Sequence, residues 1–155
     1  MTPRTLFTWL ARAEVVTWSL LLLGMALKYL TRATDLGVRV FGLAHGVVFL
    51  AYVLLALVLW VDQRWSVRQV ATVLGAGVLP FATLWVERWV GRRGILGEQW
   101  RLTPQGDAAR TAPERVVAAA LARPATAVLV AAALVGVTTV ALVVVGPPPV
   151  PGQGA

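Results

Sequence analysis

The sequence contains no cysteine, and charged residues occupy only 14% of its 155 positions. The missing cysteine excludes disulfides, thiolate metal sites, thiol nucleophiles and iron–sulfur clusters. The scarcity of charge accompanies a hydrophobic content of 58% and a mean hydropathy of +0.75. Soluble domains are about 45–50% apolar and about 25% charged, and a small globule could not bury such a surplus. The composition therefore predicts an integral membrane protein.

Histidine and lysine are also scarce, so arginine carries most of the net charge of +7. The arginines lie between apolar stretches and do not form a basic face with interleaved aromatic residues, which argues against nucleic acid as a partner. A single histidine without cysteine gives little support to a haem or metal site, and no metal site is predicted. The identity of any cofactor is left open.

Four apolar stretches are long enough to cross the hydrocarbon layer, which takes about 20 helical residues. They cover residues 6–30, 40–61, 67–90 and 124–145. Their length and continuous apolar character disfavour barrel strands, and most of the tryptophans lie near their ends, as interfacial anchors do. The sequence predicts an all-α helical membrane bundle with four transmembrane helices, made of a three-helix core at 4–90 and an additional C-terminal helix at 124–146.

Two further segments complete the predicted organisation. Residues 91–123 form an Arg-rich loop, in which Thr111 and Glu114 have capping-box spacing with Pro113 between them. This pattern predicts a short amphipathic helix that runs to Arg123. Pro124 then either separates this helix from the fourth span or only bends the helix where the two join. Residues 147–155, rich in proline and glycine, are predicted to be an extended tail.

The basic residues predict an orientation. With four crossings, the connections after the first and third helices share a side and hold most of the basic residues: Lys28, Arg32, Arg39, Arg88, Arg92, Arg93, Arg101, Arg110, Arg115 and Arg123. The opposite side has Arg4, Arg12, Arg64 and Arg68. The positive-inside rule then places these two connections in the cytoplasm and both termini outside it.

Ionisable residues inside a span are costly, so each needs a partner, water or a function. The candidate polar site comprises Glu14, Lys28, His45 and Glu87. Alternating spans put the last three in one leaflet and Glu14 in the other. This predicts an ion pair between Lys28 and Glu87, with His45 close enough to hydrogen-bond to it or to water.

Each of these residues also has a purely structural explanation. Lys28 can extend its amine to the interface, Glu87 can lie there beside Arg88, and His45 can be a hydrogen-bonding residue between helices. Glu14 can be neutral or paired with an arginine near the surface. The alternative for Glu14 is a functional role as a proton-binding group.

Small residues predict where the helices pack. Gly42 and Gly46 have the spacing that lets two membrane helices approach closely. In the third stretch, Gly75 and Pro80 permit close approach and a kink.

Five separated sequence elements resemble one family. They are Glu14, Gly-Met-Ala-Leu-Lys-Tyr at 24–29, Val-Phe-Gly-Leu-Ala-His-Gly-Val-Val-Phe-Leu-Ala-Tyr at 40–52, Trp65-Ser66, and Leu-Pro-Phe-Ala-Thr at 79–83 followed by Glu87. Over residues 4–90 the chain resembles the small bacterial integral membrane family known as domain of unknown function 3817. It departs from the family at Val15, where glycine is usual, and at Ala26, where proline is frequent. The resemblance implies a three-helix core with a Glu, Lys, His and Glu pattern and supplies no reaction. The predicted location is the bacterial inner membrane.

Three functions compete at this point. The favoured hypothesis is a non-enzymatic accessory, assembly or interaction subunit, whose partners are the lipid bilayer and either a second copy or another membrane protein. The alternative is a small oligomeric transporter or channel that uses the intramembrane Glu, His and Lys groups. An enzyme with His45 as base and Glu87 orienting it ranks last, because no nucleophile motif or phosphate-binding loop accompanies them.

Overall fold

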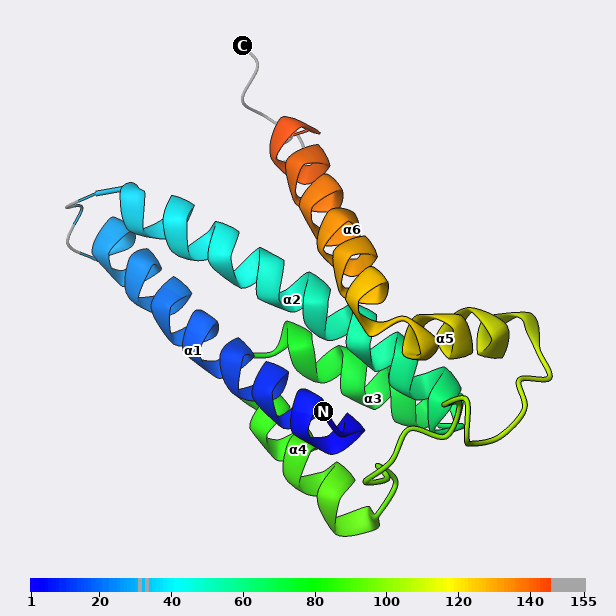
Figure 1. Cartoon of the computed structure of the whole chain (residues 1–155). Coiled ribbons are helices and arrows are strands. Elements are labelled where there is room, and N and C mark those ends of the chain that lie inside the picture. The colour runs from blue at the N-terminus through cyan, green and yellow to red at the C-terminus, as the bar shows by residue number, and fades with distance from the viewer. Residues whose placement is uncertain (31, 33, 146–155) are drawn as a thin grey trace.

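The computed structural model describes residues 1–30, 32 and 34–145, and within them it contains six helices and no strand (Figure 1). The all-α prediction is therefore confirmed for the described part of the chain. The predicted tail at 147–155, and residue 146 at the predicted end of the fourth span, lie outside the described residues.

Two long helices, α1 (Pro3–Tyr29) and α2 (Leu36–Asp62), form an antiparallel pair (Figure 1). Each has 27 residues, which corresponds to a length of about 40 Å. The backbones touch near the connection, because a Cβ atom on Gly24 would lie 2.8 Å from the carbonyl carbon of Gly37. These two glycines therefore set the spacing of the pair at that end.

The predicted third span is not one helix but two, α3 (Val67–Val78) and α4 (Ala82–Arg93). Leu79 is extended, as the residue before proline tends to be, and Pro80 offers no backbone N–H to continue the helix. Phe81 has a φ of 64°, a left-handed conformation that costs a non-glycine residue roughly 1–2 kcal/mol. The sequence predicted a kink at Pro80, whereas the chain reverses direction there.

The two helices form a hairpin, named here the helical hairpin (residues 67–93), whose two ends lie together. The indole Nε1 of Trp65, just before α3, donates to the carbonyl of Ile95, just after α4, at 2.8 Å. The amide of Gly97 donates to the side chain of Gln63 at 2.8 Å. With 12 residues, or about 18 Å, α3 extends only partway along α2 before the chain returns.

The loop after the hairpin also contacts the N-terminal end of the chain. Arg4 forms an ion pair with Glu98 at 2.7 Å, and the indole of Trp100 donates to the carbonyl of Met1 at 3.0 Å. The loop at 94–111 therefore lies at the end of the α1–α2 pair that holds the N-terminus, opposite the end where α1 leads to α2. The prediction that the first and third connections share a side of the membrane assumed an unbroken third helix, which the structure does not contain.

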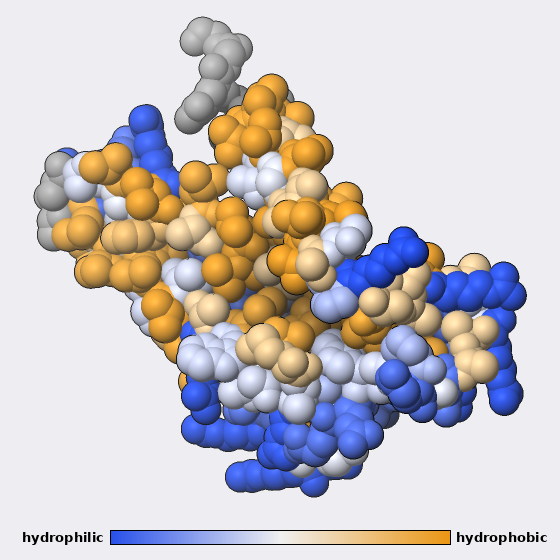
Figure 2. Space-filling view, in the orientation of Figure 1, coloured by the Kyte–Doolittle hydropathy of each residue, from blue (hydrophilic) through white to orange (hydrophobic). Residues whose placement is uncertain are grey.

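In the described residues, three helices are long and apolar enough to cross a membrane: α1, α2 and α6 (Pro124–Val145). The short apolar helix α3 does not reach that length. Four crossings are therefore not confirmed, and the third predicted span is replaced by the helical hairpin. Figure 2 shows apolar surface over α6 and the upper parts of α1 and α2, and polar surface where α4 and its following loop lie.

Helix α5 (Ala112–Ala122) begins with the predicted capping box, in which Thr111 and Glu114 each bond to the other's backbone amide. Arg123 separates it from α6, so the chain turns before Pro124 and does not merely bend. Helix α6 has no buried residue, and it contacts α2. Its part-buried positions recur every four residues, at Ala127, Ala131, Val135 and Thr139.

A polar cluster fastens the loop onto the end of α2. The carboxylate of Asp62 accepts hydrogen bonds from the amides of Arg101 and Leu102, at 3.2 and 3.0 Å, and is fully buried. The Arg101 guanidinium then reaches Glu114 at 2.8 Å. We call Asp62, Arg101 and Glu114 the clasp, because they join α2, the loop and α5.

Candidate functional site

Near the middle of the α1–α2 pair, Glu14 and His45 form a buried acid–base pair. Glu14 is fully buried, and its Oε2 lies 3.4 Å from Nδ1 of His45. The Thr17 hydroxyl donates to the carbonyl of Glu14 at 3.1 Å and lies 3.2 Å from the same Nδ1. Since the hydroxyl donates its proton to that carbonyl, its oxygen can accept a hydrogen bond from Nδ1–H of His45. We call these residues the Glu14–His45 pair, with Thr17 as its neighbour.

Neither carboxylate oxygen of Glu14 has a hydrogen-bond partner among the described residues. Buried polar atoms are normally hydrogen-bonded, and leaving one unsatisfied costs roughly 1–3 kcal/mol. A carboxyl group in this position can take up a proton or share one with the adjacent imidazole. The arrangement is therefore suited to proton binding.

The tip of the helical hairpin lies over this pair. The Trp18 ring lies 4.4 Å from the His45 ring, centroid to centroid, and its indole donates to the carbonyl of Gly77 at 3.3 Å. A Cβ atom at Gly77 would lie 3.1 Å from the rings of Phe49 and Tyr52. Glycine therefore allows α3 to pack tightly against α2 beside His45.

Two more contacts fix the hairpin. The hydroxyl of Tyr52 donates to the carbonyl of Val73 at 2.9 Å, and that of Thr83 donates to the carbonyl of Ala11 at 3.2 Å. Tyr52 and Thr83 are both fully buried. The sequence pattern did not single out Thr17, Gly77 or Thr83 as site residues. The spacing of Thr17 from Glu14, three positions along a helix, was the one available indication.

The other two predicted site residues lie apart from this pair and from each other. Lys28 pairs with Asp35 at 3.4 Å in the connection between α1 and α2. Glu87 accepts a hydrogen bond from Thr8 at 3.0 Å. Thr8 and Lys28 are 20 positions apart on α1, or about 30 Å. The predicted Lys28–Glu87 ion pair is wrong, because α4 runs back towards the N-terminal end.

The separation of Glu14 and His45 into two leaflets is also wrong. The prediction began the second helix at residue 40, whereas α2 begins at Leu36 and places His45 deeper. Glu14 likewise lies 11 positions into α1, since that helix begins at Pro3. In an antiparallel pair these positions come together near the middle.

The predicted packing residues have mixed surroundings. A Cβ atom on Gly42 would have an ordinary contact with Leu21 at 3.7 Å, while Gly46 and Gly75 have nothing within 4 Å. The structure therefore does not use Gly46 or Gly75 for close packing inside this chain. Pro80 lies at the turn of the helical hairpin.

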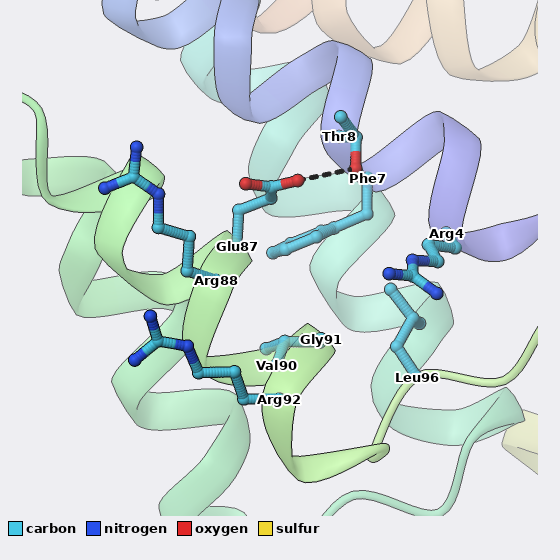
Figure 3. Close-up of a pocket in the computed structure, with 9 residues that line it drawn as sticks. All are labelled: Arg4, Phe7, Thr8, Glu87, Arg88, Val90, Gly91, Arg92 and Leu96. Atoms are coloured by element: carbon cyan, nitrogen blue, oxygen red, sulfur yellow. Dashed lines mark hydrogen bonds between the residues drawn. The ribbon is translucent and has the colours of Figure 1, made fainter.

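A pocket of about 340 Å³ lies between the first two turns of α1 and the second half of α4 (Figure 3). Glu87, Thr8 and Arg4 are among its lining residues, and Glu14 and His45 are not. Within the described residues, no group of three His, Cys, Asp or Glu side chains could hold a metal ion.

Three long apolar helices, two of which enclose an acid–base pair beside a helical hairpin, define a small helical membrane protein. Residues 4–92, more than half of the chain, match the family described as Domain of unknown function (DUF3817), and the protein belongs to this family. The resemblance seen in the sequence is confirmed. The matched region ends within α4, so it contains the Glu14–His45 pair and nearly all of the helical hairpin, while α5 and α6 lie outside it.

The chain is also similar to a protein of Streptomyces coelicolor whose name describes it as a membrane protein, with 44% identity over 91 residues. These residues are 58% of this chain but only 11% of that much longer protein. No solved structure matches the chain.

Proposed function

We propose that this protein is a non-enzymatic accessory subunit of the bacterial inner membrane, which acts by assembling with another membrane protein. The observation that carries the proposal is α6, a 22-residue apolar helix with no buried residue. A helix that is apolar all round belongs in lipid or against protein, and this one uses only one narrow side within its own chain. Its remaining faces are available to lipid and to a partner helix.

The longer relative supports the same function. In the Streptomyces coelicolor protein, the matching region is 11% of a membrane protein. A module that occurs within a much larger membrane protein fits a role alongside other membrane segments. In this chain, we infer, a separate protein supplies them.

We further propose that the protein crosses the membrane three times, with the Arg-rich end in the cytoplasm. Because the helical hairpin returns, all but three of the 14 basic residues belong to the end that holds the N-terminus and the loop at 94–111. The three at the other end are Lys28, Arg32 and Arg39. The positive-inside rule then puts the N-terminus inside. This replaces the orientation expected from four spans.

Native mass spectrometry after gentle extraction from the producing membrane tests the accessory function. We expect one copy bound to a different chain. Gly136→Leu should abolish that complex, because it adds bulk where this chain leaves open space: a Cβ atom at this glycine would have nothing within 4 Å. The matched control is Ala141→Leu, also exposed but on another side of α6. A monomer or a homo-oligomer alone would contradict the proposal.

A second candidate, proton transport by an oligomer, is favoured by the unsatisfied carboxylate of Glu14 facing His45. Reconstituted liposomes with a pH-sensitive dye inside test it. Glu14→Gln should abolish proton flux, while Glu98→Gln, which removes an exposed ion pair with Arg4, should leave it unchanged. Absence of flux in the unaltered protein, or flux that survives Glu14→Gln, would exclude this function.

A further inference from the structure

The outer face of α4 has a hollow of about 300 Å³, separate from the Glu14–His45 pair. It is lined by two tryptophans and three arginines and by no acidic residue: Trp85, Arg88, Trp89, Arg92 and Arg93. Such a lining has a concentrated positive charge beside large, partly apolar rings. We call it the arginine–tryptophan hollow.

None of its three guanidinium groups forms an ion pair with an acidic side chain in the described part of the chain. Arg88 and Arg92 are exposed and form no ion pair there, and their side chains project from the same side of α4 (Figure 3). The nearest carboxylate in sequence, Glu87, instead accepts a hydrogen bond from Thr8. The hollow therefore has uncompensated positive charge.

The tryptophans of the hollow form a stacked, partly exposed pair beside this charge. Trp85 and Trp89 stack with their ring centroids 6.3 Å apart, and Trp85 is 61% exposed. The guanidinium of Arg93 lies 5.2 Å from the centre of the Trp89 ring, a cation–π contact. Tryptophan is enriched where a membrane meets water, and α4 combines these rings with buried Thr83, Val86 and Val90 on its other face.

We propose that the arginine–tryptophan hollow binds the phosphate of an anionic phospholipid headgroup. The planar forks of Arg88 and Arg92 donate to phosphate oxygens, a geometry that guanidinium groups match in pairs of hydrogen bonds. The stacked rings of Trp85 and Trp89 lie against the glycerol and upper acyl chains. Charge complementarity selects this occupant, because the lining offers three cations and no anion.

Native mass spectrometry of the detergent-purified protein tests the proposal. The probe is an equal mixture of phosphatidylglycerol and phosphatidylcholine, and the readout is the ratio of the two bound lipids. The unaltered protein should retain phosphatidylglycerol preferentially. Arg88→Gln combined with Arg92→Gln should lower that preference about tenfold or more, since each arginine near a charged lipid is worth roughly a fivefold change in affinity.

The matched control removes two other exposed arginines, by Arg110→Gln and Arg115→Gln, and should keep the preference. A second test variant, Arg88→Lys with Arg92→Lys, keeps both charges and guards against misfolding. It should weaken the preference less, because lysine lacks the paired donors.

Three results would overturn the assignment. They are no preference in the unaltered protein, an equal loss in the Arg110 and Arg115 control, and a preference that survives Arg88→Gln with Arg92→Gln. A parallel measurement with inorganic phosphate separates the two sources of the same chemistry. Phosphate binding that depends on Arg88 and Arg92, without lipid preference, would identify an anion site and exclude the lipid.

Discussion

Glu14 and Asp62 are both fully buried acidic residues on the long helices, yet their surroundings are opposite. Asp62, at the end of α2, accepts hydrogen bonds from the amides of Arg101 and Leu102 and from the side chain of Gln63. Glu14, in the middle of α1, accepts none among the described residues, and its carboxylate lies 3.4 Å from Nδ1 of His45.

The two residues illustrate two kinds of buried carboxylate: one that stabilises the fold, and one for which we expect a different role. A buried carboxylate with matching donors organises the backbone that supplies them, as Asp62 does for the start of the ordered loop. A buried carboxylate without donors costs folding free energy, so we expect the role of Glu14 to lie outside stability. The contrast predicts that removing Asp62 damages the fold, and that neutralising Glu14 does not.

The largest effect is expected from Asp62→Ala. This change leaves the amides of Arg101 and Leu102 without their acceptor, and each unsatisfied buried group costs about 1–3 kcal/mol. The free energy of unfolding in mixed micelles should fall by roughly 2–4 kcal/mol. Asp35→Ala, which removes an exposed pair with Lys28, is the control and should cost less than about 1 kcal/mol.

Next comes Gly24→Ala, at the contact between α1 and α2. Its Cβ would lie 2.8 Å from the backbone of Gly37, so the helices must separate, and we expect a loss of about 1–3 kcal/mol in unfolding free energy. Gly46→Ala has open space and should gain up to about 1 kcal/mol from helix propensity. Equal effects from the two substitutions would show that the backbone contact is not formed.

The clasp also makes stability depend on pH. Hydrogen bonds from the Arg110 amide, the Arg101 guanidinium and the Thr111 amide lower the pKa of Glu114 to about 2, from an ordinary 4.5. Because the folded-state pKa is the lower one, this stabilisation is complete above pH 4.5 and disappears as pH falls towards 2.

Glu114→Gln measures that dependence. The substituted protein should unfold more easily at neutral pH, and the difference from the unaltered protein should shrink as pH is lowered through this range. A difference that stays constant from neutral pH to pH 2 would contradict the hydrogen-bonded carboxylate. Melting temperatures over a pH series provide the measurement.

The smallest stability effect is expected from Glu14→Gln. Glutamine keeps the size of the side chain and removes a buried charge without donors, so stability should be unchanged or higher by about 1 kcal/mol. Its effect should appear in complex formation or proton flux instead. A loss of more than about 2 kcal/mol would show that the Glu14–His45 pair is a structural contact, as Asp62 is.

Much of the fold follows from local patterns. Long apolar runs located α1, α2 and α6, and the spacing of Thr111 and Glu114 located the start of α5. The sequence did not predict the helical hairpin, because the apolar stretch continues through residues 79–81 and a proline at position 80 is compatible with a kinked span. The extended conformation of Leu79 and the left-handed conformation of Phe81 depend on tertiary packing, which a hydropathy pattern does not report.

The sequence named Glu14 and His45, which the structure brings together, but it wrongly grouped His45 with Lys28 and Glu87. Their membrane depth was inferred from alternating spans, and one broken helix moved Glu87 to the other end of α1. Similarly, glycine spacing favoured Gly42 and Gly46, whereas the backbone contact is between Gly24 and Gly37. Those two lie on either side of the connection between α1 and α2, so their contact depends on how the helices cross.

If the helical hairpin returns to the side of the membrane on which it begins, residues 34 and 105 face opposite sides. Because the chain has no cysteine, single cysteines at Thr34 and Gln105 can each be labelled with a membrane-impermeant maleimide in intact cells and in inverted vesicles. The account predicts opposite sides, with Thr34→Cys labelled from outside and Gln105→Cys only in inverted vesicles. Labelling of both positions from the same side would contradict it and restore a continuous third span.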